Sequence, residues 1–168
     1  MLDMIQHMDR IEESLSNLSK KNKGKFGSWC VDFIFRQPDI TQGFDSLESR
    51  EMFDFIQSSI DFIRSSKDDP FILEEYISKA DRMGLEDIME GGDELLGALS
   101  SMLVGYQIDD AQYIANCAER ALNYMDHAKA PPSSSQEEYQ SSMLELADAQ
   151  VRMLDLLQQG ATISGIKE

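Results

Sequence analysis

Two histidines and two cysteines are the residues of this sequence best suited to chemistry. His7 and His127 stand neither in an HExxH pattern nor beside a cysteine, so they lack the ligand spacing of a transition-metal site. Cys30 and Cys117 lie far apart and form no CxxC pair. We therefore expect both histidines to have surface or helix-capping roles. We expect two free, buried thiols, because cysteine behaves as a small hydrophobe, and a single bridge is the alternative.

Motifs for phosphate, calcium and nucleophilic chemistry are missing from the sequence. It has no GxxxxGKS/T or GxGxxG loop, no D-x-D-x-D-G calcium loop and no GxSxG elbow. Gly91-Gly92 precedes a helical pattern, but Asp93 and Glu94 follow at once and would repel phosphate. The sequence thus predicts no catalytic residue, no metal and no cofactor, and we expect a protein that is not an enzyme.

The chain of 168 residues is strongly acidic, with 15 Lys and Arg against 31 Asp and Glu and a net charge of −16. Residues 1–25 hold five bases and four acids, so the rest of the chain carries −17. Nucleic acids and anionic membranes bind basic surfaces, and neither is therefore an expected partner. The hydrophobic content of 42% favours a folded core over a disordered acidic tail.

Acidic residues are densest between positions 68 and 94, where only Lys79 and Arg82 oppose them. Such a field can steer and dock a basic protein partner. Solubility and the preference of helix N-termini for negative charge are the alternative explanations. We predict that the partner-binding residues of this region are Asp68, Asp69, Glu74, Glu75, Glu86, Asp87, Glu90, Asp93 and Glu94.

The elements that must position these residues are helices, because apolar residues recur with helical period between the few prolines and glycines. No strand pattern stands out. We expect an all-α, single-domain bundle of six to seven helices with short loops, spanning residues 1–168. The expected helices cover about 2–19, 25–37, 46–66, 70–82, 93–106, 110–128 and 135–159, with a short helical turn around 85–90.

The chain ends and the breaks between these helices complete this expectation. Residues 1–24 are expected to be an N-terminal helix followed by a basic loop, and Pro38 is expected to end the second helix. The Pro/Ser stretch 129–135 reads as a linker, and Ser135 with Glu138 forms a capping box. Residues 161–168 are expected to be a frayed tail. The sequence shows no secretory signal and no apolar run long enough for a membrane span, so a cytoplasmic protein is expected.

Two groups of proteins resemble this sequence. The stretch Phe26–Phe35, with Asp93–Leu103 followed by Ala111–Tyr124, is similar to the YjaG-like family of uncharacterised helical bacterial proteins. As a small, acidic, all-helical chain it also resembles the immunity proteins encoded beside bacterial toxins. Both resemblances imply a single-domain helical bundle, and the second implies direct occlusion of a toxin's active site. No site residue is transferred from either group.

The leading functional hypothesis is a non-enzymatic acidic binding protein, an immunity protein that neutralises a cognate toxin, for which a nuclease suits the charge best. Exposed aromatic residues would anchor this contact. The first alternative is a regulatory or adaptor bundle that binds another protein or itself as a homodimer. The second is an enzyme with a carboxylate-lined pocket, which a cavity joining several acids to His7 or His127 would favour.

Overall fold

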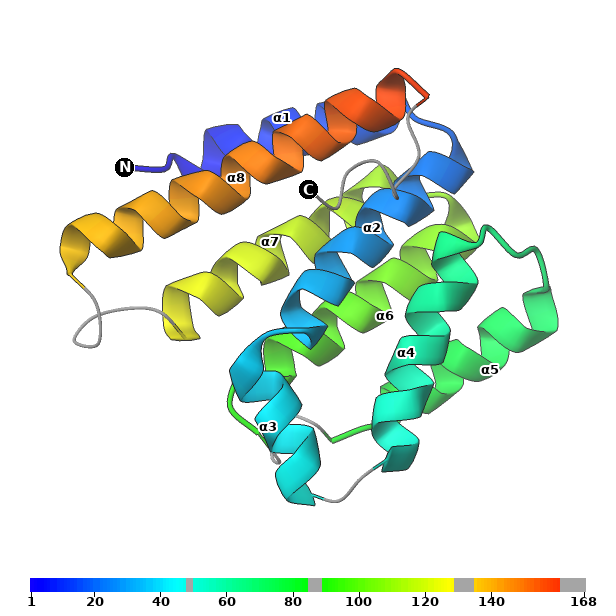
Figure 1. Ribbon diagram of the computed structural model, residues 1–168. Helices are drawn as coiled ribbons and strands as arrows, with labels where there is room; N and C mark the ends of the chain where they lie inside the picture. The colour runs from blue at the N-terminus through cyan, green and yellow to red at the C-terminus, as the bar shows by residue number, and fades with distance from the viewer. Residues whose placement is uncertain (48–49, 85–88, 129–134, 161–168) are drawn as a thin grey trace.

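The computed structural model describes residues 1–47, 50–84, 89–128 and 135–160. Within these ranges the chain forms eight α-helices and no strand, which confirms the all-α prediction with one or two helices more than expected (Figure 1). The helices are α1 (Met4–Ser16), α2 (Lys20–Phe35), α3 (Pro38–Leu47), α4 (Arg50–Arg64), α5 (Pro70–Asp81), α6 (Gly92–Ile108), α7 (Ala111–Ala128) and α8 (Gln136–Gln158).

The helices α2, α6 and α7 form the centre of the bundle. The short connection at Asp109 and Asp110 folds α7 back along α6 as an antiparallel hairpin, and α2 packs against both helices. Helices α1 and α8 lie side by side across α7, whereas α4 and α5 cover the other side of α6 (Figure 1). All eight helices contribute side chains to the hydrophobic core.

The helix α3 was not expected from the sequence. Pro38 begins this helix instead of only ending the one before it, because proline fits the first turn of a helix. Ile40 and Phe44, four residues apart, bury one face of the helix. The Phe44 ring packs edge-on against Phe35 and Phe53, at centroid distances of 6.0 and 5.8 Å. The third expected helix therefore begins at about Arg50 rather than at residue 46.

The predicted basic loop at the end of residues 1–24 is wrong, because residues 20–25 form the first turns of α2. Lys23 is buried and its Nζ atom lies 2.7 Å from Oδ1 of Asp109, the residue that caps the end of α6. A Cβ atom on Gly24 would lie 2.8 Å from the Tyr106 ring, so glycine permits this close helix contact. Cationic side chains at the C-terminal end of α6 also match the negative end of its dipole.

His7 is not at the surface as expected, whereas the prediction for the cysteines is confirmed. His7 is buried between α1 and α8, where its Nε2 atom lies 2.8 Å from Oε1 of Gln150. Gln150 in turn donates to the Ala118 carbonyl of α7 at 3.1 Å, so the polar groups link three helices. Cys30 and Cys117 are free and buried, and burial raises the pKa of each thiol.

The predicted short turn at 85–90, the linker at 129–135 and the tail at 161–168 lie wholly or largely outside the described residues. Ser135 caps α8 and forms the expected capping box with Glu138. In the part of the chain that the structure describes, no helix is both long enough and apolar enough to cross a membrane.

Candidate functional site

The structure divides the acidic region 68–94 between two places at opposite ends of α6. Near the end of α6, Nε2 of Gln107 donates to Oε2 of Glu74 on α5 at 2.7 Å. Glu90, Asp93 and Glu94 lie at the beginning of α6. At 1.5 Å per residue, α6 separates Glu94 from Gln107 by about 20 Å. Glu86 and Asp87, which were also predicted to bind a partner, lie outside the described residues.

The first place is the outer side of α5, which we call the α5 face. Its residues line a shallow, open depression of about 520 Å³; they are Phe71, Glu74, Glu75, Ser78, Lys79 and Arg82. On the opposite side of α5, Leu73 and Ala80 are buried. Tyr76 packs edge-on against Phe55 and Phe62 of α4 at 5.6 and 5.5 Å. These contacts hold α5 in a fixed orientation with the α5 face toward solvent.

Phe71 is the most unusual residue of the α5 face, because 86% of this large apolar side chain is exposed. It stands in the first turn of α5, after Pro70. Oδ1 of Asp69 accepts hydrogen bonds from the backbone N–H groups of Phe71 and Ile72 at 3.1 and 3.2 Å. Asp69 therefore serves as the helix cap, and it fixes the backbone that carries Phe71. The sequence contained a signal for this exposure, since Phe71 is out of phase with buried Leu73 and Ala80.

The charges of the α5 face are unequally compensated. Nζ of Lys79 lies 3.8 Å from Oε1 of Glu51 and 4.8 Å above the Phe55 ring, so this cation is engaged by α4. Glu75 and Asp68 are exposed and take part in no ion pair among the described residues. Arg82 at the far end of the face is exposed and its Nε atom donates to the Ser78 carbonyl at 3.2 Å, so the negative charge lies at the end of the face beside the Phe71 ring.

The second place is a small cavity of about 190 Å³ between the start of α6 and the end of α7. We call it the α6 pocket; its lining residues are Glu90, Gly91, Asp93, Glu94, Tyr124 and His127. Gly91 has a φ of +82°, and a Cβ atom there would lie 2.6 Å from the Tyr124 ring. Glycine is thus required at this corner both by its backbone conformation and by the ring.

Glu94 differs from the exposed docking residue that the sequence suggested, because it is only 7% exposed. Its Oε2 atom accepts from Nη1 of Arg120 at 3.3 Å, and its Oε1 atom lies 4.0 Å from Nδ1 of His127. Gly97 gives room for Arg120, whose Cζ atom would lie 2.7 Å from a Cβ atom on that glycine. Glu94 therefore neutralises a cation of the neighbouring helix. His127 is exposed in the last turn of α7, as expected.

Tyr124 supplies a buried polar group that the sequence did not reveal. Its side chain is 1% exposed, and its hydroxyl has no hydrogen-bond partner among the described residues. Burial, together with the nearby carboxylates of Asp39 and Glu90, raises the pKa of Tyr124 to about 12. The side chain is therefore a neutral phenol at pH 7.

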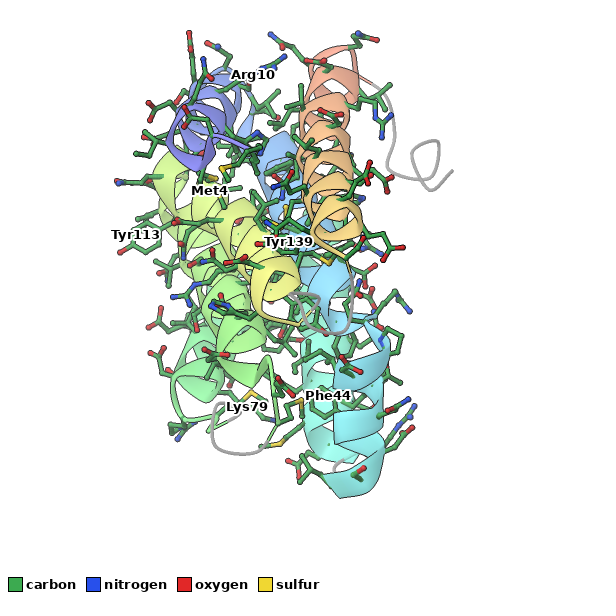
Figure 2. All side chains as sticks on the ribbon, turned by 90° about the vertical axis from the view of Figure 1, so that its left-hand side faces the viewer. Met4, Arg10, Phe44, Lys79, Tyr113 and Tyr139 are labelled. Carbon is green, nitrogen blue, oxygen red and sulfur yellow. The ribbon has the colours of Figure 1, made fainter. Side chains whose placement is uncertain are left out.

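A larger cavity of about 450 Å³ lies between α1, α6 and α7. Two of its polar groups pair with each other, since Nδ2 of Asn116 donates to Oγ of Ser101 at 2.6 Å. Tyr113 at its edge projects outward from α7 (Figure 2). A groove between α1 and α8 joins His7 to acids such as Asp3 and Asp148, but Gln150 already engages His7.

In residues 1–47, 50–84, 89–128 and 135–160, no group of three His, Cys, Asp or Glu side chains is arranged to hold a metal ion. Comparisons of the chain with protein-family models, with curated proteins and with solved structures found no match.

Proposed function

We propose that this chain is a non-enzymatic binding protein that recognises a basic protein partner through the α5 face. The partner class that fits this role best is a bacterial toxin whose active site the chain covers, as immunity proteins do. The single observation that carries the proposal is the exposed Phe71 ring, held on a capped helix and flanked by acids.

Phe71 supplies the apolar part of such a contact. Complete burial of a phenylalanine side chain contributes about 1.5–3 kcal/mol, and most of this ring is still available for burial. Because Asp69 and Tyr76 fix α5 before binding, little conformational entropy is lost when a partner covers the ring. Aromatic anchors of this kind contribute most of the binding energy at many interfaces.

The negative charge supplies the long-range part of the contact. Glu75 and Asp68 are exposed on or beside the α5 face, and the chain as a whole carries −16. Such a surface accelerates association with a basic partner and repels an acidic one. A nuclease toxin fits best, because its substrate-binding cleft must be basic to bind phosphate groups.

The test is to mix the purified chain with the product of the neighbouring gene and to measure both complex formation and residual toxin activity. Formation of a 1:1 complex, with loss of toxin activity when the chain and the toxin are equimolar, supports the proposal. Binding should weaken steeply with added salt and with Glu75→Lys, whereas Glu145→Lys on the exposed side of α8 should bind normally. If the toxin binds Glu75→Lys as tightly as it binds the wild-type chain, and both inhibit it equally, the role of the α5 face is contradicted.

Self-association is the competing use of the same face, since Phe71 and its neighbour Ile72 are both exposed. Sedimentation velocity over a range of concentrations separates the two uses. A monomer that persists at high concentration agrees with the proposal. A dimer that Phe71→Ala dissociates would assign the α5 face to a homodimer instead.

An enzyme is the second candidate, because the α6 pocket joins Glu90, Asp93 and Glu94 to His127. Two features disfavour acid–base chemistry there. Glu94 is already paired with Arg120, and Tyr124 is a neutral phenol whose raised pKa makes it a poor proton donor. An enzyme would be favoured if the chain turned over a substrate and if His127→Ala abolished this turnover while the variant still folded.

A further inference from the structure

The cavity of about 450 Å³ between α1, α6 and α7, which we call the α7 cavity, is large enough to hold a ligand. Sites for small molecules begin at roughly 300 Å³. On the α1 side the lining residues are Met8 and Glu12, which are four positions apart. On the α7 side they include Gln112, Asn116 and Glu119, which follow one another at helical spacing. Two polar helix faces therefore line opposite sides of the α7 cavity.

The floor of the α7 cavity holds a pair of neutral polar groups. Ser101 of α6 is only 8% exposed, yet it lines the cavity, and its Oγ atom accepts from Nδ2 of Asn116 at 2.6 Å. The same amide group carries Oδ1, which accepts no hydrogen bond from any residue that the structure describes. Ala115 beside it is 4% exposed and leaves the floor open, because its side chain is small. A bound N–H group therefore finds an acceptor at the floor.

The charge of the α7 cavity is negative. Glu12 is exposed and Glu119 is half-buried, and neither enters an ion pair among the described residues. The described residues that line the cavity include no basic side chain. Carboxylate and amide oxygens accept hydrogen bonds, so the groups on both sides match a cation that carries several N–H donors.

We propose that the α7 cavity binds one guanidinium group. This group is planar and carries five N–H donors on different edges, so it can donate at once to Glu12 on α1 and to Glu119 and Asn116 on α7. An ammonium group fits less well, because its donors surround a single point and it is more strongly hydrated. Met8 and Ala115 offer apolar surface to the methylene groups that carry the guanidinium.

An arginine side chain on a protein and a small free guanidine share this chemistry. The α7 cavity is also separate from the α5 face, since α1 and α8 lie across α7, whereas α4 and α5 cover the other side of α6 (Figure 1). Binding at the α7 cavity is therefore an additional property of the chain and does not depend on the contact proposed for α5.

The binding test uses the full chain labelled with ¹⁵N and the backbone amide signals of Met8, Ser101 and Asn116. Four probes are titrated to millimolar concentrations: Nα-acetyl-arginine methylamide, butylguanidine, Nα-acetyl-lysine methylamide and Nα-acetyl-citrulline methylamide. The citrulline probe has nearly the shape of the arginine probe but no charge. Saturable shifts with a guanidinium probe, and weaker binding of the lysine and citrulline probes, support the proposal. The tighter of the two guanidinium probes identifies the source as a protein side chain or as a small guanidine.

Two variants test the groups that would hold the guanidinium. Glu12→Gln and Asn116→Leu should each weaken binding about tenfold, which corresponds to the loss of one hydrogen bond to a charged group. Glu13→Gln is the matched control, because it makes the same change at the next residue, which lines the groove between α1 and α8 instead. Glu12 is exposed, so Glu12→Gln tests the site even if Asn116→Leu fails to fold.

The proposal is overturned if neither guanidinium probe gives a saturable shift, or if the citrulline probe binds as tightly as the arginine probe. Tighter binding of the lysine probe, or wild-type affinity in Glu12→Gln, would overturn the assignment of a guanidinium to these groups. No partner of the α5 face takes part in these measurements, so their outcome is independent of the function proposed for that face.

Discussion

Glu94 in the first turn of α6 accepts a hydrogen bond from Arg120 in α7 at 3.3 Å, although 26 residues separate them in the chain. In the sequence, Glu94 is predicted to bind a partner. In the structure, its contact with Arg120 links the two central helices α6 and α7. Among the described residues, Glu90 and Asp93 near the start of α6 enter no ion pair. Acids of the same short segment therefore differ in their surroundings: Glu94 stabilises the packing of α6 on α7, whereas Glu90 and Asp93 are exposed.

Removal of Arg120 should destabilise the fold, because Glu94 would remain buried without its partner. We expect Arg120→Met to lower the free energy of unfolding by about 1–3 kcal/mol in urea denaturation. The double variant Glu94→Gln/Arg120→Met should recover part of this loss. Arg152→Met, at an exposed position of α8, is the control and should change stability by less than about 0.5 kcal/mol. Additive losses in the double variant would exclude the coupling.

Gly24 should be intolerant of any side chain. A Cβ atom there would lie 2.8 Å from the Tyr106 ring and 3.2 Å from Ile63, so the helix contact between α2 and α6 must open. Gly24→Ala should therefore cost about 1–3 kcal/mol. Gly84→Ala is the matched control, because a Cβ atom at that position meets nothing within 4 Å. Equal thermal midpoints for the two variants would contradict this packing.

Tyr124→Phe should not destabilise the protein, in contrast to most substitutions of buried residues. The change keeps the ring that packs on Gly91 and removes only a hydroxyl that has no described partner. The free energy of unfolding should stay equal or rise by up to about 1 kcal/mol. A clear loss of stability in urea denaturation would mean that the hydroxyl is already hydrogen-bonded inside the chain.

The two buried thiols should make stability depend on alkaline pH. Burial raises the pKa of Cys30 and Cys117 above their ordinary value of about 9. A group whose pKa is raised by folding stabilises the folded state fully below its unfolded pKa, and this contribution is lost as pH rises above that value. The free energy of unfolding should therefore fall between pH 8 and pH 10. The fall should be smaller in Cys30→Ala/Cys117→Ala, and parallel profiles would exclude the thiols as its cause.

The strongest periodic patterns predicted their helices well. The expected boundaries of α5, α6, α7 and α8 lie within a few residues of those observed, because each helix has clear start signals or a continuous apolar stripe. Helix α3 was missed because ten residues with only Ile40 and Phe44 buried give a weak stripe. The lysines before Phe26 were predicted to lie in a loop. They form a helix in which Lys20 contacts the Tyr106 ring and Lys23 contacts Asp109, and these partners are distant in the chain.

The candidate site was only partly predictable. The nine acids are close in sequence, but the antiparallel packing of α5 on α6 separates Glu74 from Glu94. Phe71 could have been identified from its phase on α5. The contact of Tyr124 and His127 with the region of Gly91 could not have been predicted from the sequence, because the α6–α7 hairpin brings together residues more than 30 positions apart.

The affinity of Phe71→Ala for the basic partner tests most directly whether the α5 face is the binding surface. Titration calorimetry would compare it with wild type and with Ile5→Ala, which changes an apolar residue that is 78% exposed on α1. Phe71→Ala should keep its stability within about 0.5 kcal/mol. It should bind about ten- to a hundredfold more weakly, while Ile5→Ala binds as wild type does. Wild-type affinity in Phe71→Ala, or an equal loss in both variants, would contradict recognition through the α5 face.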